Sequence, residues 1–245
     1  MANPKTVDKA AVDKAFEALK TYDWGADRKL LAAIDDAVAA THGNAAARKE
    51  LETRLVAALK SGASRAAKDF VCRTLKTIGT AESVPALAAL LPDKDLSHMA
   101  RYALERIPAP EAAAAMRDAL PKLNGALKIG VIGSLGVRRD GASVEPIAAG
   151  LGDSDKAVAC AAASALGNIG SMEAGKALYG SVKTAPEGVK AAVADGCLAC
   201  AERLLADGNK AGALYLYKAL NTPDQPKHVR LAATRGMLAV AGKKE

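Results

Sequence analysis

Apolar residues recur along the chain with the spacing of one helix face. Between residues 158 and 169 they stand at positions 158, 161, 162, 165, 166 and 169. Steps of three and one place all of them on a single stripe of an α-helix, so the spacing predicts a helix with one buried face. The stripe recurs in further registers that begin at residues 67, 96, 127, 189 and 229. The chain therefore has an internal repeat of about 31 residues.

A second, shorter apolar pattern follows most of these stripes. Glycine or proline in the intervening turn, as at Gly79, Pro108 and Gly170, ends the first helix. The pattern predicts second helices at residues 83–91, 111–120, 143–151, 173–182 and 210–220. Apolar positions 84, 87 and 91 match positions 144, 147 and 151, so the second helix also has a fixed inward face. The repeating unit is thus a pair of helices.

These pairs predict an all-α fold, a right-handed α-solenoid of stacked antiparallel helix pairs. About five and a half repeats fill residues 63–245 and form one continuous solenoid. Less regular helices, expected at residues 5–20, 24–40 and 45–60, make residues 1–62 an N-terminal capping region that shields the first repeat. The sequence stops directly after a first helix, which indicates a piece of a longer protein or an open end that meets a partner.

Composition narrows the classes of function. Half of the residues are hydrophobic but only 3% are aromatic, which favours closely packed helices over a β-sandwich or barrel. No apolar run is long enough to span a membrane, and residues 1–20 lack the apolar core of a signal peptide, so a soluble, cytoplasmic protein is the default expectation. Four cysteines are too few for a disulfide-stapled secreted scaffold. The net charge of +7 permits acidic partners, although no run of five basic residues occurs.

The sequence AAASALGNIG at residues 161–170 resembles the HEAT-like repeats first described in phycobilisome lyases. Residues 74–79 and 227–233 fit the same pattern more loosely, and the resemblance extends over residues 64–242. It implies an α-solenoid fold. Repeats of this family occur in scaffolds, adaptors, lyase subunits and domains of unrelated enzymes, so the resemblance implies no single activity.

The CxxC motif of Cys197 and Cys200 is the sharpest local signal for chemistry, because two thiols at this spacing can form a redox pair or half of a zinc site. Both cysteines fall on the apolar stripe, however, where a small buried residue is needed. No second CxxC occurs, and His42, His98 and His228 stand at no ligand spacing to this one. We therefore expect these thiols to serve packing rather than a metal or redox site.

Other motifs also have structural explanations. Gly130, Gly133 and Gly136 follow the spacing GxxGxxG rather than that of a phosphate loop, and they lie within a predicted helix, so they indicate close helix packing. The acidic pair Asp35 and Asp36 fits a solvated helix face better than acid–base catalysis. Neither a nucleophile motif nor a cofactor motif is visible, so the sequence predicts no catalytic residue, no cofactor and no enzyme activity.

Tyrosines and lysines gather on the last two predicted second helices. Second helices line the concave side of HEAT-type stacks, where aromatic and cationic side chains anchor protein interfaces or stack on nucleic-acid bases. Alternatively, one or two of the tyrosines pack between helices while the lysines are solvated. The candidate partner-binding residues are Lys176, Tyr179, Lys183, Lys210, Tyr215, Tyr217 and Lys218.

The sequence therefore predicts a non-enzymatic scaffold or adaptor that binds a protein or peptide on the concave face of a solenoid. A basic nucleic-acid-binding protein of the DNA-repair type is an alternative. The glycosylases among such proteins need an aromatic cleft with a placed acid, whereas Trp24 is the only tryptophan and lies in the capping region. An accessory subunit of a bilin lyase is a third reading, which rests on the name of the repeat. No membrane partner is expected, and the oligomeric state stays open.

Overall fold

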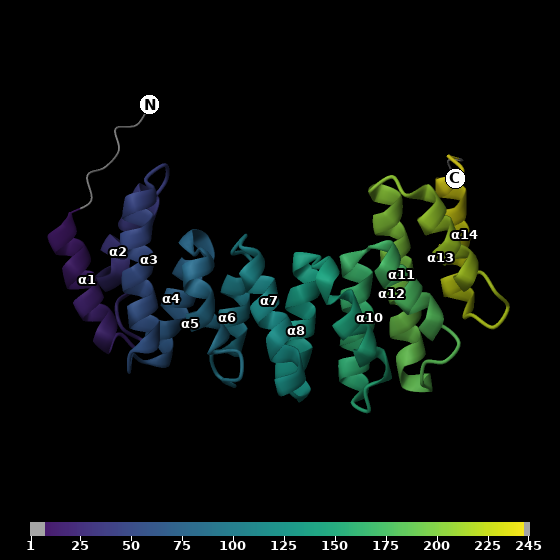
Figure 1. The fold of residues 1–245 in the computed structure, drawn as a ribbon, viewed down its shortest axis with the longest axis horizontal. Coiled ribbons are helices and arrows are strands. Elements are labelled where there is room, and N and C mark those ends of the chain that lie inside the picture. Colours follow the sequence, from purple (N-terminus) through teal and green to yellow (C-terminus); the bar gives the residue numbers. More distant parts are fainter. Residues whose placement is uncertain (1–7, 243–245) are drawn as a thin grey trace. The chain divides into compact units, whose positions relative to one another are not determined.

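The computed structural model describes residues 8–242 (Figure 1). Within this range the backbone forms α-helices and short 3₁₀ turns without any β-strand, which confirms the predicted all-α class. The chain divides into two compact units, Met1–Ala119 (unit 1) and Leu120–Glu245 (unit 2). Residues 1–7 of the predicted cap and 243–245 of the predicted array lie outside the described range. The boundary between residues 62 and 63, and the continuity of the solenoid across it, stay predictions.

Unit 1 begins with three helices and continues with helix pairs. First helices pack against first helices of the next pair, as α4 does against α6. Second helices pack against second helices in the same way, as α5 does against α7. Helix α3 packs against α4 and so covers the first repeat. The elements are α1 (Lys9–Thr21), α2 (Ala32–Ala40), α3 (Ala45–Lys60), α4 (Arg65–Ile78), α5 (Val84–Ala88), α6 (Ser97–Leu104) and α7 (Pro110–Ala119).

Unit 2 has the same two rows of helices. Helix α10 packs between α8 and α12 in the first row, and α11 packs between α9 and α13 in the second. The last helix, α14, lies against α12 and α13. The elements are α8 (Gly125–Arg138), α9 (Val144–Ala148), α10 (Lys156–Ile169), α11 (Met172–Ser181), α12 (Glu187–Ala206), α13 (Lys210–Leu220) and α14 (Lys227–Val240).

One equivalent position in each repeat, which we call a column, supplies a core residue to each helix pair. Leu75 and Leu104 in unit 1, and Leu135, Leu166 and Cys197 in unit 2, hold the same position of the apolar stripe, and all of them are fully buried. Burying a leucine side chain contributes about 1.5–3 kcal/mol relative to leaving it in water. The predicted register of the repeat is therefore correct, because a shift by one residue would turn this column toward solvent.

Small residues let the first helices of unit 2 approach one another closely. A Cβ placed on Gly196 of α12 would lie 2.6 Å from the backbone oxygen of Ala163 in α10. A Cβ on Gly136 of α8 would lie 2.9 Å from the Cα of Ala165. Of the predicted packing glycines, Gly136 is therefore at a helix contact, whereas Gly133 faces open space.

Two polar side chains of α3 bind the end of α4 and the turn that follows it. The Nε of Arg48 donates to the carbonyl oxygen of Ile78 at 2.6 Å. The carboxylate of Glu52 accepts from the backbone N–H of Thr80 at 2.7 Å and from its hydroxyl at 2.9 Å. Glu52 is only 2% exposed, and these bonds offset the cost of burying its charge. This buried carboxylate therefore joins α3 to the turn after α4.

Some predicted helix boundaries are wrong. The helix expected at residues 24–40 begins only at Ala32, after a turn at Trp24–Ala26 and a 3₁₀ turn at Arg28–Leu31. Gly25 has φ +88°, which is incompatible with an α-helix, and Asp27 caps the 3₁₀ turn by accepting from the N–H of Lys29. The second helices α5 and α9 are also shorter than predicted, whereas α3 and α13 have the predicted bounds.

Candidate functional site

The exposed faces of α11 and α13 lie side by side in unit 2. Each helix buries a leucine, Leu178 in α11 and Leu216 in α13, and the neighbouring Tyr179 and Tyr215 are turned outward, 43% and 41% exposed. The two tyrosine rings have centroids 4.8 Å apart and planes tilted by 39°. Aromatic pairs at this separation stabilise a structure by about 0.5–1.5 kcal/mol beyond the burial of their surface. The contact therefore favours this arrangement of the two rings at the surface.

A cavity of about 510 Å³ opens beside these rings. Lys183, in the turn after α11, and Lys218 of α13 line it together with Tyr179 and Tyr215. Both lysines are exposed, and they are the charged side chains among the described residues that line this cavity. We call these four residues the Tyr–Lys face; it combines aromatic surface with positive charge.

The other three predicted residues lie outside this cavity. Lys176 and Lys210 are exposed but do not line it. Tyr217 is only 2% exposed, and a Cβ on Gly236 of α14 would overlap its ring, so Tyr217 fills the contact between α13 and α14. Burial raises the pKa of the Tyr217 phenol, and the charge of Glu202 adds to the rise. Tyr217 thus follows the alternative in which a tyrosine packs between helices.

A second cavity, of about 400 Å³, lies between α12 and the segment that leads into α14. Lys183 lines this cavity as well as the first one. Here the charges are mixed: Lys190 pairs with Glu187 at 2.8 Å, and Asp224 also lines the wall. Hydrogen bonding from the Thr222 side chain lowers the pKa of Asp224, and the charge of Lys183 contributes to that shift. Positive charge is therefore less offset on the Tyr–Lys face than in this neighbouring cavity.

The CxxC cysteines serve as core residues. Cys197 and Cys200 are both fully buried. Burial raises the pKa of the Cys197 thiol from 9.0 to about 12 and that of Cys200 to about 11. Since the thiolate is the form that attacks disulfides and binds metals, a raised pKa opposes both uses. The interpretation of these thiols as small buried apolar groups is consistent with this environment.

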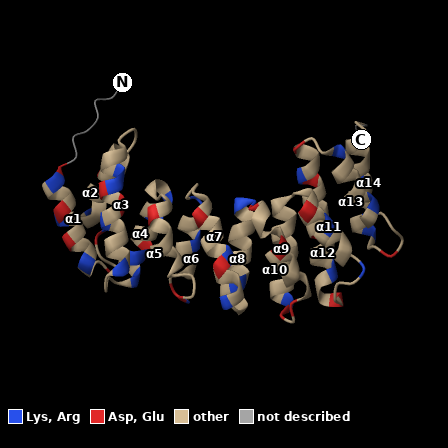
Figure 2. Ribbon diagram, viewed as in Figure 1, with Lys and Arg blue, Asp and Glu red and all other residues tan. Residues whose placement is uncertain are grey.

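The histidines and the acidic pair considered from the sequence also lie on separate elements. His42, in the turn after α2, His98 in α6 and His228 in α14 are all exposed. Asp35 of α2 forms an ion pair with Arg28 at 2.9 Å. Over residues 8–242, no group of three or more His, Cys, Asp or Glu side chains could hold a metal ion. Side chains of both charge signs occur in both units (Figure 2).

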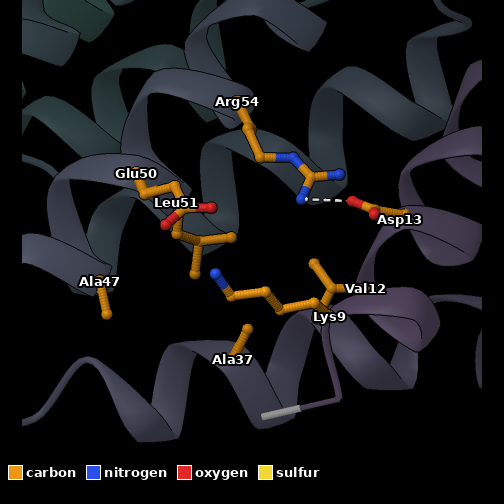
Figure 3. Close-up of a pocket in the computed structure, with 8 residues that line it drawn as sticks. All are labelled: Lys9, Val12, Asp13, Ala37, Ala47, Glu50, Leu51 and Arg54. Atoms are coloured by element: carbon orange, nitrogen blue, oxygen red, sulfur yellow. Dashed lines mark ion pairs between the residues drawn. The ribbon is translucent and has the colours of Figure 1, made fainter.

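A pocket of about 180 Å³ lies between α1, α2 and α3 (Figure 3). Arg54 crosses it and pairs with Asp13 at 2.8 Å, while the same guanidinium lies 4.0 Å from the centroid of the Phe16 ring. Lys9 and Glu50 add one charge of each sign to the wall. Arg54 is thus held by the carboxylate of Asp13 and by the face of the Phe16 ring.

Sequence reasoning missed a group of aromatic and arginine side chains in unit 1. Tyr22, Trp24, Phe70, Arg28 and Arg73 line one cavity of about 340 Å³. They come from the turn after α1, the 3₁₀ turn and α4, so no local motif joins them. The sequence indicated this group through composition, because the single tryptophan of the chain lies in this unit.

No helix in the described part of the chain is long and apolar enough to cross a membrane. The family comparison concerns the segment that carries the most regular repeats. Residues 119–196 match the family model for HEAT repeats, and this segment contains α8 to α11 and the start of α12. The chain carries HEAT-like repeats. No curated protein matches it.

Solved structures similar to this HEAT-like chain include one from the complex of CpcE and CpcF of phycocyanin lyase from Nostoc sp. PCC7120. It is 17% identical with a TM-score of 0.44, and the match covers 98% of this chain and 97% of that one. Human deoxyhypusine hydroxylase in complex with glycerol is 15% identical, with a TM-score of 0.40 and coverage of 96% and 97%. An engineered protein is 21% identical, with a TM-score of 0.30 and coverage of 94% and 96%. Because these scores are low, the HEAT-like assignment rests on the repeat pattern, the helix pairs and the family match.

Proposed function

We propose that the chain is a non-enzymatic scaffold that binds a partner protein through the Tyr–Lys face of its HEAT-like repeats. One observation carries this proposal: Tyr179 and Tyr215 lie ring against ring at a cavity that Lys183 and Lys218 also line. In a chain with 3% aromatic residues, two paired and exposed tyrosines form a surface suited to an interface anchor. Tyrosine is among the residues that contribute most to protein binding.

The chemistry of this face defines the partner segment that it fits. The rings offer apolar surface for an aliphatic, aromatic or proline side chain, and the two lysines attract carboxylates. A segment that combines an apolar anchor with acidic neighbours would satisfy both. Repetition of the helix pairs supplies a rigid support, because each pair packs against its neighbours.

The absence of enzyme activity is part of the proposal and has its own support. The buried thiols are held protonated, the buried Glu52 is engaged by Thr80, and the histidines lie on separate elements. These groups are the kinds of side chain that acid–base or nucleophilic catalysis uses, and each is occupied or dispersed.

Affinity capture with matched variants tests the proposal. The wild-type chain and the double variant Tyr179→Ala, Tyr215→Ala are compared in extract with and without nuclease treatment, and the bound proteins and nucleic acids are identified. We expect defined protein partners to bind the wild type and to be lost from the double variant. Val137→Ser serves as the control, because Val137 is 55% exposed on α8 and lies outside the Tyr–Lys face; it should retain the partners.

Circular dichroism must show equal helix content for all variants, since both tyrosines are half-exposed and their truncation should leave the fold intact. Equal capture by the wild type and the double variant would place the interface elsewhere and refute the proposal. Nucleic acid that the wild type recovers from untreated extract and the double variant does not recover, with protein partners lost on nuclease treatment, would favour the nucleic-acid alternative for this face.

A further inference from the structure

A cavity lined by aromatic side chains lies in unit 1, between the turn after α1 and α4. Trp24 is 68% exposed in that turn, and it lines the cavity of about 340 Å³ together with Tyr22 and Phe70. Leaving an indole ring in water forgoes the stabilisation that burial of its surface would bring. The ring stands instead beside a cavity that two further aromatic side chains line.

The charged groups that line this cavity cancel one another. Arg28 pairs with Asp35 at 2.9 Å, and its guanidinium lies 4.4 Å from the centroid of the Phe70 ring. Arg73 pairs with Asp69 at 3.3 Å. A cationic ligand would meet both arginines, and an anionic ligand would meet both aspartates. The wall therefore favours a neutral planar group whose edge carries both donors and acceptors, since the arginines donate and the aspartates accept.

Positive charge accumulates immediately beside the cavity, around Tyr102 of α6. The Nζ of Lys76 donates to the Tyr102 hydroxyl at 2.8 Å and lies 4.4 Å from its ring centroid. This hydrogen bond lowers the pKa of the Tyr102 phenol, and the charges of Lys76, Arg73 and Arg106 lower it further. Glu105, directly after α6, is an acidic neighbour of this group. Burial lowers the pKa of Arg101, and the charge of Glu105 raises it. We call Lys76, Tyr102, Arg73 and Arg106 the Tyr102 cluster; Arg73 belongs to both the cluster and the cavity wall.

We propose that this part of unit 1 binds a nucleotide, with the base in the Trp24 cavity and the phosphate at the Tyr102 cluster. A nucleobase is a neutral planar ring with donors and acceptors along its edge, and it stacks on indole and guanidinium planes. The phosphate carries the negative charge that Lys76 and Arg106 attract. The charge pattern of the ligand thus matches that of the surface in both halves. A single-stranded nucleic acid and a free nucleotide share this chemistry.

Fluorescence of Trp24 reports directly on this site, because Trp24 is the only tryptophan. The chain is titrated with adenosine 5′-monophosphate, with a short single-stranded DNA and with a short polyglutamate peptide. We expect the nucleotide and the DNA to change the emission in a saturable way. Tighter binding of the DNA identifies a strand as the source of the ligand, and equal binding identifies the free nucleotide. An emission change produced by polyglutamate alone would overturn the proposal in favour of an acidic protein partner.

Variants separate the two halves of the site. Binding of a dye-labelled DNA, followed by anisotropy, should weaken roughly 5- to 150-fold in Trp24→Ala, which corresponds to the loss of one stacked base. Leu30→Ala is the control, because Leu30 is 52% exposed on the adjacent 3₁₀ turn and does not line the cavity. Lys76→Gln should reduce the slope of log affinity against log salt by about one, as the loss of one phosphate contact does. The matched variant Lys60→Gln, on α3, should leave that slope unchanged.

Absence of saturable quenching together with equal affinities for the wild type and Trp24→Ala would refute the proposal. Because Trp24 lies in a turn and is largely exposed, its truncation should preserve the helix content, which circular dichroism verifies. The Tyr–Lys face belongs to unit 2 and is tested with other variants, so either site can fail independently of the other.

Discussion

Replacing Gly196 with alanine tests how closely α10 and α12 approach. The new Cβ would lie 2.6 Å from the backbone oxygen of Ala163 and 3.1 Å from a methyl group of Leu178. Ordinary contacts begin near 3.4 Å, so α12 must move by about 0.8 Å or α10 must bend. A backbone oxygen cannot rotate away as the end of a side chain can. Overpacking of this kind costs about 1–3 kcal/mol, and we expect the upper half of that range.

Gly133→Ala is the matched control, because Gly133 lies in the middle of α8 with no atom near its would-be Cβ. Alanine is favoured over glycine in a helix interior by about 1 kcal/mol. Both variants gain this term, so the difference between them isolates the clash. We expect Gly133→Ala to stabilise the fold by about 0.5–1 kcal/mol and Gly196→Ala to destabilise it by about 1–2 kcal/mol.

The assay is urea-induced unfolding followed by far-ultraviolet circular dichroism, with hydrogen exchange to locate the change. Amides of α10 and α12 should lose protection in Gly196→Ala, while those of unit 1 should keep theirs. If Gly196→Ala proves as stable as Gly133→Ala, the close approach of the two helices is refuted, because the shared gain in helix propensity cannot hide a clash present in only one of them.

Two further predictions concern the core of unit 2. Leu166→Ala should cost about 2–5 kcal/mol and should lower hydrogen-exchange protection more in α8 and α12 than in α14; equal loss throughout the unit would contradict coupling between neighbouring repeats. The free energy of unfolding should also fall as pH rises above about 9. In the folded chain the thiols of Cys197 and Cys200 have pKa values of about 12 and 11, whereas in the unfolded chain they lose their protons near 9.0. Rising pH therefore stabilises the unfolded chain relative to the folded one. Urea unfolding at pH about 8 and about 10 measures the decline, and a double change of these cysteines to alanine that left the decline unaltered would refute the assignment to them.

The tyrosines of α13 show where sequence reasoning about the site stopped. Tyr215 and Tyr217 stand two residues apart, which turns them about 200° from each other around the helix. Tyr217 shares its face with the buried Ala213 and Leu220, four residues before it and three after. The periodicity of the second helix therefore contained the signal that Tyr217 packs inward. The pairing of Tyr179 with Tyr215 was not predictable in this way, because it depends on the distance between two helices.

The sequence by itself determined the helices, their pairing and the buried position of the repeat that Leu75 and Leu104 hold in unit 1 and Leu135 and Leu166 hold in unit 2. These features follow from the period of apolar residues, which is a local property of an amphipathic helix and repeats along the chain. Tertiary structure alone decided which side chains share a cavity. The Trp24 cavity unites a turn, α2 and α4. Of the ion pairs on its wall, Arg28–Asp35 joins the 3₁₀ turn to α2, whereas Arg73–Asp69 lies within α4. Burial and charge at such a site depend on the neighbouring helix that covers each face, and the pattern within one helix does not contain that information.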